Sequence, residues 1–168
     1  MPRLRLIAKA LCWWAERVMN KRPADLVIGH EGDWYLHRWY VLPQSRRWPN
    51  VMIHRYTRSD DDRAHHDHPW ANVTFVLKGE LIEHRGKQAG DEAAAALKQG
   101  DLVLRGAETA HRIELFHPED RPITLFITGA KSREWGFWCP GKGWRHNKTF
   151  ITPEEGVGKS TIGRGCDD

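Results

Sequence analysis

Short runs of β-branched and aromatic residues, separated by turn-forming residues, fill most of the chain after its first two dozen residues. Such runs predict short strands, which we place at residues 34–42, 51–56, 72–77, 81–84, 102–104, 111–116, 123–128 and 135–139. Glycine, proline or aspartate separates most of them, and no helical pattern alternates with them. This arrangement predicts an all-β, antiparallel sandwich or barrel. The alanine-rich stretch 91–98 fits either a helical turn or a strand.

Residues 3–19 carry the clearest helical pattern in the chain. Apolar side chains recur there at spacings of three and four, at Leu4, Ile7, Leu11, Trp14 and Val18. This periodicity is typical of an amphipathic helix. Lys9, Glu16 and Arg17 interrupt the apolar core that a signal peptide would need. A helix lying on a membrane surface is an alternative, but we favour packing against the domain or a second subunit.

These patterns divide the chain into an N-terminal helical arm (1–22), a β-barrel domain (23–151) and a polar, Gly-rich tail (152–168). The tail contains Gly158-Lys159-Ser160, which resembles the end of a phosphate-binding loop. That motif requires a glycine five residues before Gly158, and Pro153 stands there instead. We therefore predict no nucleotide site.

Composition narrows the possible partners. A chain of 168 residues corresponds to one domain, and it contains no apolar run of the ~20 residues that span a bilayer. A net charge of +4 favours neither nucleic acid nor a membrane as partner. The three cysteines are few, odd in number and far apart, which favours a reducing cytoplasm over a disulfide framework. Cys139 is then expected to be an inert buried thiol.

The segment 60–70, DDDRAHHDHPW, holds the strongest chemical signal. Residues i and i+2 of a strand share one face, so the imidazoles of His66 and His68 can converge on one metal ion. His65 and Asp67 then point the other way. We interpret Asp67 as a loop or supporting residue and Asp60, Asp61 and Asp62 as a solvated loop.

Two motifs resemble those of the cupin superfamily. The first is His-x-His, then Glu, then Gly; His66, His68 and Gly79 match it, and Asn72 holds the Glu position. The second begins with Gly and contains a His; Gly100 and His111 match it. Its Pro, second Gly and Asn positions differ, holding Gly106, Glu108 and Leu115. The resemblance covers about residues 34–138. More narrowly, RSDDDRAHHDHPW, LFITGAKSREWGFWCP and the following GWRH resemble a small group of uncharacterised bacterial and phage cupins.

The resemblance implies a single cupin barrel, a double-stranded β-helix or jelly roll. It implies that His66, His68 and His111 bind a metal, with Asn72 as a weak fourth candidate. Three imidazoles suit divalent Fe, Ni, Zn, Cu or Co. If these histidines face inward on unbroken strands, so do Trp70, Asn72, Thr74, Val76, Ile113 and Leu115.

The sequence does not fix the strand register of five further polar residues, so the face on which each of them lies is undetermined. We expect only some of them near the cavity: His54, Arg55, Tyr56, His84 and Arg112. No residue is assigned a catalytic role from sequence. The nine tryptophans are spread along the chain, which favours core or dimer packing over ligand stacking.

Three functions stay open. The first is a metal-dependent dioxygenase or isomerase acting on a small organic substrate. The second is a non-catalytic small-ligand-binding or sensor module, which Asn72 in place of Glu favours. The third is a metal-free, epimerase-like cupin with a histidine base, for which His65 and Asp67 are candidates. We further expect a homodimer, formed through strand edges or the N-terminal helix.

Overall fold

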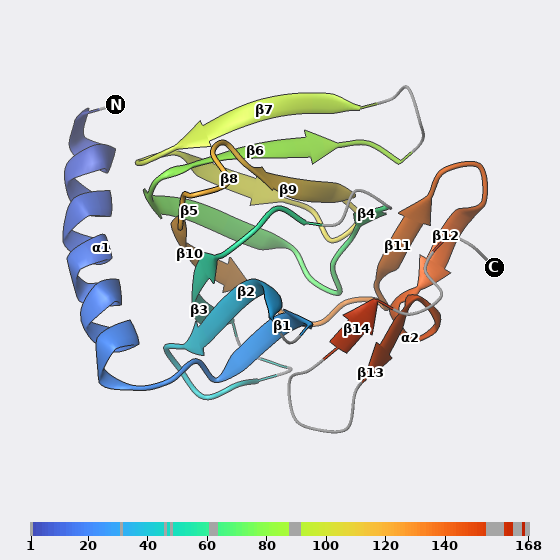
Figure 1. The fold of residues 1–168 in the computed structure, drawn as a ribbon, viewed down its shortest axis with the longest axis horizontal. Helices are drawn as coiled ribbons and strands as arrows, with labels where there is room; N and C mark the ends of the chain where they lie inside the picture. Colours follow the sequence, from blue (N-terminus) through green and yellow to red (C-terminus); the bar gives the residue numbers. More distant parts are fainter. Residues whose placement is uncertain are drawn as a thin grey trace.

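A computed structural model describes residues 2–30, 32–45, 47, 49–60, 64–87, 92–153, 160–162 and 166. The described chain is mostly β, as Figure 1 shows. It contains two helices, α1 (Pro2–Lys21) and the short α2 (Asn147–Phe150). The strands are β1 (Leu26–His30), β2 (Asp33–Tyr40), β3 (Asn50–Tyr56), β4 (His65–His66), β5 (Asn72–Lys78), β6 (Glu80–Arg85), β7 (Ala93–Lys98), β8 (Leu102–Arg105), β9 (His111–Leu115), β10 (Ile123–Thr128), β11 (Gly136–Cys139), β12 (Gly143–His146), β13 (Ile151–Pro153) and β14 (Ser160–Ile162).

The strands form two antiparallel sheets. Sheet A has the order β13-β14-β1-β2-β3-β10-β5-β8, and sheet B has the order β12-β11-β4-β9-β6-β7. Side chains from both sheets line one cavity between them. The all-β prediction is confirmed, but the predicted barrel is open, because neither sheet closes on itself among the described residues.

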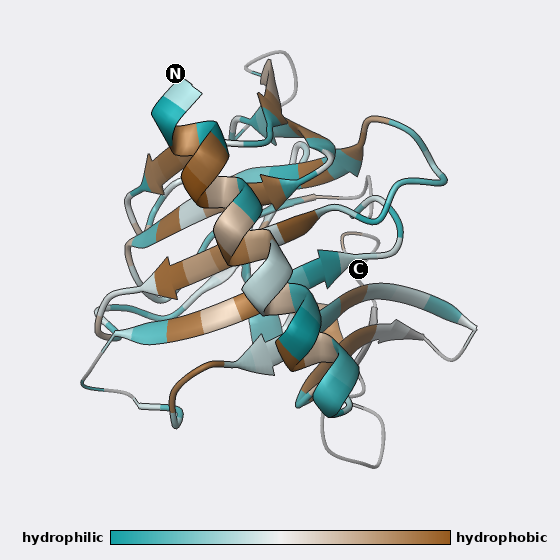
Figure 2. Cartoon of the chain, turned by 90° about the vertical axis from the view of Figure 1, so that its left-hand side faces the viewer, coloured by the Kyte–Doolittle hydropathy of each residue, from teal (hydrophilic) through white to brown (hydrophobic). Residues whose placement is uncertain are grey.

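The helix α1 covers the outer face of sheet A, and Figure 2 shows it crossing the strands. Ala8, Cys12 and Ala15 are buried there against a cluster of outward-facing sheet residues, Trp39, Ile53, Phe75, Leu77 and Ile123. Small residues at the centre of the contact let the helix approach the sheet closely. Leu11, Trp14 and Val18 pack beside them as predicted, whereas Ile7 is 49% exposed and lies off the buried stripe. No helix in the described ranges is long and apolar enough to cross a membrane.

A second apolar cluster lies between the sheets. Leu36, Tyr56 and Val76 of sheet A meet Leu81, Leu97, Ile113 and Leu115 of sheet B. Successive strand residues point to opposite faces, so one face of sheet A packs on α1 and the other faces sheet B. The predicted inward positions of Val76, Ile113 and Leu115 are confirmed.

The two motif glycines both occupy turns that require them. Gly79 joins β5 to β6 with φ +77°, and Gly100 joins β7 to β8 with φ +94°. An L-residue rarely adopts this backbone conformation. The two glycines shared with the cupin motifs are therefore explained by the tight turns through which the chain passes from one sheet to the other.

Several expected elements differ from the structure. Most of the alanine-rich stretch forms strand β7, and its first residue, Asp91, lies outside the described part. The polar tail contributes β13 and β14, and β14 pairs with β1. Gly158 and Lys159 of the phosphate-loop-like sequence lie outside the described residues. Cys139 forms a disulfide with Cys166, so the prediction of an unpaired thiol is wrong; the cytoplasmic localisation stays a prediction.

Candidate metal centre

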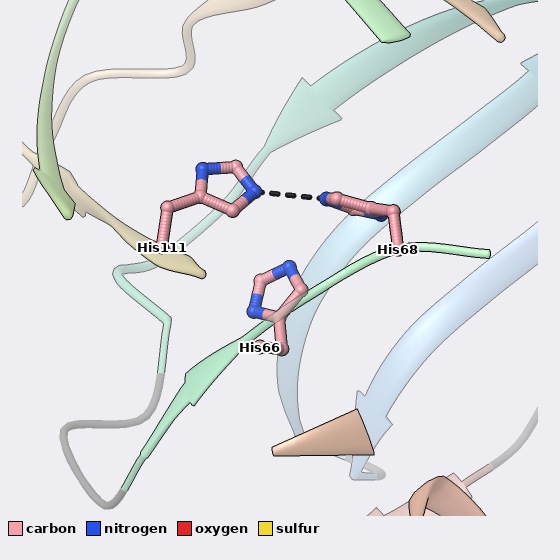
Figure 3. A group of neighbouring side chains, drawn as sticks. All are labelled: His66, His68 and His111. Atoms are coloured by element: carbon pink, nitrogen blue, oxygen red, sulfur yellow. Dashed lines mark hydrogen bonds between the residues drawn. The ribbon is translucent and has the colours of Figure 1, made fainter. Parts of the chain in front are cut away.

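The structure brings His66, His68 and His111 together between the sheets (Figure 3). One ring nitrogen from each lies within 4.8 Å of the other two. His66 of β4 and His111 of β9 are direct cross-strand partners, which places their rings side by side. The Nε2 atoms of His68 and His111 are 2.8 Å apart.

The route of the chain to His68 differs from the prediction of an unbroken strand. Strand β4 ends at His66 in sheet B, and the chain crosses to sheet A, where β5 begins at Asn72. His68 lies on this crossover, where its backbone N–H donates to the carbonyl of Ala107. Pro69 follows and cannot donate to a strand partner. The rings of His66 and His68 nevertheless meet, with centroids 5.1 Å apart.

A buried carboxylate fixes the orientation of the His111 ring. Nδ1 of His111 lies 2.8 Å from Glu83 Oε1, and both side chains are buried. An ionised carboxylate can only accept, so Nδ1 carries the proton and donates it. The lone pair is then on Nε2, which faces the other two rings. This is the carboxylate–histidine arrangement that supports metal ligands in proteins.

A second carboxylate stands behind His66. Its Nδ1 lies 3.1 Å from Asp60 Oδ2, and Asp60 also lines the cavity. A carboxylate at this distance favours the tautomer of His66 that has its proton on Nδ1 and its lone pair on Nε2. The interpretation of Asp60 as a solvated loop residue is therefore wrong, while Asp61 and Asp62 lie outside the described residues.

The pKa directions agree with neutral imidazoles and an ionised Glu83. Burial raises the pKa of Glu83, but hydrogen bonds from His111, Arg105 and Arg85 outweigh it and hold that pKa well below its usual range. Burial lowers the pKa of His111 to about 4, against the opposing hydrogen bond to Glu83. Burial, followed by the proximity of His111, lowers the pKa of His68 well below its ordinary value. Neutral imidazole is the form that binds metal ions.

The weak candidate Asn72 has a different partner. Its Oδ1 accepts a hydrogen bond of 3.2 Å from the guanidinium of Arg105, which also bonds Thr74 Oγ1 at 2.6 Å. Arg105 is buried and forms an ion pair with Glu83. Asn72 therefore stands in a polar network beneath the histidines, in which Glu83 supplies the negative charge.

The three histidines open onto a cavity of about 470 Å³. Most of its wall is apolar or aromatic, including Ile28, Leu36, Leu97, Ile113, Phe126 and Phe137. A second hollow of about 360 Å³ shares the residues Pro69, Trp70, Trp135, Asn147 and Lys148 with it. The site thus combines a three-nitrogen donor set with room for a small, largely apolar molecule.

The polar residues whose strand register the sequence did not fix lie on both faces of their sheets. His54 and Tyr56 line the cavity, as do Trp70 and Thr74. Arg55 lies on the other face of β3, over the ring of Trp39 at 5.4 Å. His84 and Arg112 lie away from the cavity, where both contact Glu92 and Glu114.

Asp67 points away from the cavity, as its position between the two histidines predicts. Its buried carboxylate accepts from the Gly136 backbone N–H at 2.8 Å and from the Trp144 and Trp138 indoles at 2.9 and 3.3 Å. Arg133 lies 2.9 Å from it. Asp67 therefore joins the crossover to the β11–β12 hairpin. Two of the nine tryptophans have this specific role, which packing alone did not predict.

Comparison with known proteins adds evidence on the fold. No protein-family model matches the sequence, and no curated protein is significantly similar to it. Similar solved structures include a cupin superfamily protein from Desulfitobacterium hafniense, with 18% identity over 57% of this chain and 78% of that one and a TM-score of 0.45. An uncharacterized conserved protein with a double-stranded β-helix domain from Klebsiella pneumoniae has 22% identity over 62% and 84%, with a TM-score of 0.48. HppE in its Fe(II) form has 15% identity over 61% and 54%, with a TM-score of 0.50.

The chain has the cupin fold. The two facing antiparallel sheets and the superposition on HppE carry this conclusion, and it confirms the prediction made from the two motifs. The chain spans about half the length of HppE.

Proposed function

We propose that this protein is a metal-dependent cupin that binds a divalent transition metal through His66, His68 and His111 and converts a small organic substrate, most plausibly by oxygenation or isomerisation. The observation that carries the proposal is the convergence of three imidazoles within 4.8 Å at the wall of a cavity. This donor set fits divalent Fe, Ni, Zn, Cu or Co. Carboxylates on Nδ1 of two of the rings support the same assignment.

The residues of the site would act as follows. Glu83 would accept the Nδ1 proton of His111 and leave its Nε2 lone pair for the ion, and Asp60, 3.1 Å from Nδ1 of His66, would favour the same tautomer of that ring. When bound, the ion supplies a Lewis-acid or redox centre with coordination positions open to the cavity. The apolar wall excludes water from the substrate, which strengthens electrostatic interactions inside.

Metal analysis tests the proposal directly. Protein purified without an affinity tag is analysed for metal, together with His66→Ala, His111→Ala and the control His117→Ala, which changes an exposed ring. We expect about one ion per chain in wild type and control and little in the two site variants. Equal metal content in all four proteins would refute the proposal.

Two alternatives have observations in their favour. A non-catalytic ligand-binding module is favoured by Asn72 at the Glu position, and oxygen uptake with a panel of thiols, diketones and hydroxylated aromatics would exclude it. A metal-free site with a histidine base needs a histidine–carboxylate pair, and His111–Glu83 is one. The structure does not form the His65–Asp67 pair; His65 contacts Gly86 and Glu92 instead.

A further inference from the structure

The positive charges around the cavity are not all balanced. Among the described residues, three arginines line it: Arg38, Arg58 and Arg105. Arg105 forms an ion pair with the buried Glu83, and Arg58 lies 3.0 Å from Asp33 Oδ1. Arg38 has no carboxylate partner within the described part of the chain. The one hydrogen bond of its side chain to another described residue runs from Nε to His54 Nε2, at 2.9 Å. A fourth cationic group, Lys148, stands exposed where the cavity meets the second hollow.

His54 orients Arg38 without neutralising it. The two residues are direct partners on β2 and β3, so their side chains project from the same face of sheet A. A guanidinium can only donate, so His54 Nε2 accepts and the ring is neutral. The ring is buried and stacked on Phe126, with centroids 4.9 Å apart. The strand pairing and the stacking fix the Nε side of the guanidinium and leave its two terminal nitrogens available.

The surroundings of Arg38 do not provide the missing negative charge. Among the described residues, Asp60 is the only carboxylate in the cavity wall, and it lies against His66. The rest of the wall near β2 is apolar, with Ile28 and Leu36 packed in the cluster between the sheets. An unpaired cation beside apolar surface is costly unless an anion joins it. The natural counter-ion is therefore a ligand.

We propose that Arg38 binds the carboxylate of the substrate, and that the substrate is a small organic acid with an apolar body. The planar fork of a guanidinium matches a carboxylate with two parallel hydrogen bonds. Arg38 is the one arginine of the described cavity wall that has no carboxylate partner, and its two terminal nitrogens match the two oxygens of one carboxylate. The assignment of the reacting end to the three histidines rests on the proposed function, whereas the Arg38 contact does not.

Matched pairs of acids and amides test this contact. Titration calorimetry compares acetate, benzoate and 3-phenylpropanoate with acetamide, benzamide and 3-phenylpropanamide. The protein is used as purified and after loading with metal. Hydrogen bonds to charged groups contribute roughly tenfold to a hundredfold in affinity, and we expect a preference of this size for at least one acid. In the metal-free protein, Arg38→Gln should remove the preference, and Arg38→Lys should retain part of it. The control Arg58→Gln changes a cavity arginine that already has a carboxylate partner and should leave the preference unchanged.

The outcomes separate the two proposals. No preference for the acid in any pair overturns the assignment of Arg38, and this comparison needs only wild-type protein. An equal loss in Arg58→Gln and Arg38→Gln also overturns it, since it would indicate a general positive potential. An Arg38-dependent preference in a protein that binds no metal supports the carboxylate site and refutes the proposed metal function. Metal binding without any acid preference supports the proposed metal function and refutes the carboxylate site.

Discussion

Replacing Asp67 with Asn, an isosteric change, should destabilise the protein strongly. Asn keeps one carbonyl oxygen, which can still accept from the Gly136 N–H. It places an NH₂ group where Oδ2 now accepts from the indoles of Trp138 and Trp144 and pairs with Arg133. The two indole N–H groups and the Arg133 guanidinium would then face the amide N–H of residue 67, which is itself a donor. Residue 67 is fully buried, so water cannot supply the missing acceptor.

The magnitude follows from the partners that are lost. Leaving a buried donor without an acceptor costs about 1–3 kcal/mol. Arg133 is 28% exposed and can reach water, so we count only the two indole donors, which together give about 2–6 kcal/mol. For a domain of this size each kcal/mol lowers the melting temperature by about 2–4 °C. The expected decrease is therefore about 10 °C.

Urea unfolding and thermal melts of metal-free protein measure the effect, with Glu134→Gln as control. Glu134 is an exposed carboxylate that pairs with Lys131 just before the same hairpin. Its loss should leave the free energy of unfolding close to that of the wild type, as for most surface sites. If Asp67→Asn is as stable as this control, the buried carboxylate does not join the crossover to the hairpin, and the reasoning is wrong.

We expect four further experimental outcomes. Glu83→Gln should weaken metal binding about 10–100-fold in a competitive chelator titration, because the support behind His111 is lost. Burial, and then the charge of Arg38, lowers the pKa of His54, so below about pH 6.5 the unfolded chain binds a proton at this ring and the folded chain does not. Urea unfolding should therefore show the free energy of unfolding falling from about pH 7.5 to about pH 5.5, by up to about 1.4 kcal/mol per pH unit for this group. The slope should be smaller in His54→Gln. Reduction of Cys139–Cys166, which are 27 residues apart, should cost about 3–4 kcal/mol on the loop-entropy model, and Cys12→Ser should not alter that difference. Sedimentation at micromolar concentration should show a homodimer, because β7 and β8 end their sheets as edge strands and Leu6, Trp13 and Leu104 are exposed; a monomer would contradict this.

The sequence was most informative where a pattern reflects local geometry. The spacing of His66 and His68 predicted that these two rings meet, and the resemblance to the cupin motifs added His111 to the same cluster. The two motif glycines lie in the turns that they predict. The strands from β2 to β11 that are rich in β-branched and aromatic residues were found within two residues of their ends. The two-residue strand β4 and the crossover that contains Pro69 show no hydrophobic periodicity. The sequence therefore did not reveal that the strand ends at His66.

The supporting groups were missed because they depend on pairings between distant strands. Glu83 reaches His111 only because β6 pairs with β9, and Arg38 meets His54 only because β2 pairs with β3 in that register. A run of three aspartates is most often solvated, and nothing local marks Asp60 as the one that contacts His66. A one-residue slip in register would send each of these side chains to the opposite face.

The position of these groups also explains how the site can work without a glutamate at position 72. A carboxylate ligand in a cupin site would lower the charge of the ion directly. Here the carboxylates of Glu83 and Asp60 contact the histidine rings and not the place where the ion would bind, and Glu83 also interacts with Arg105 and Arg85. A bound divalent ion would therefore keep most of its positive charge, at the wall of a cavity that already contains the unpaired guanidinium of Arg38. An anionic ligand complements both charges, so metal loading should increase the preference for acids over amides and should not decrease it.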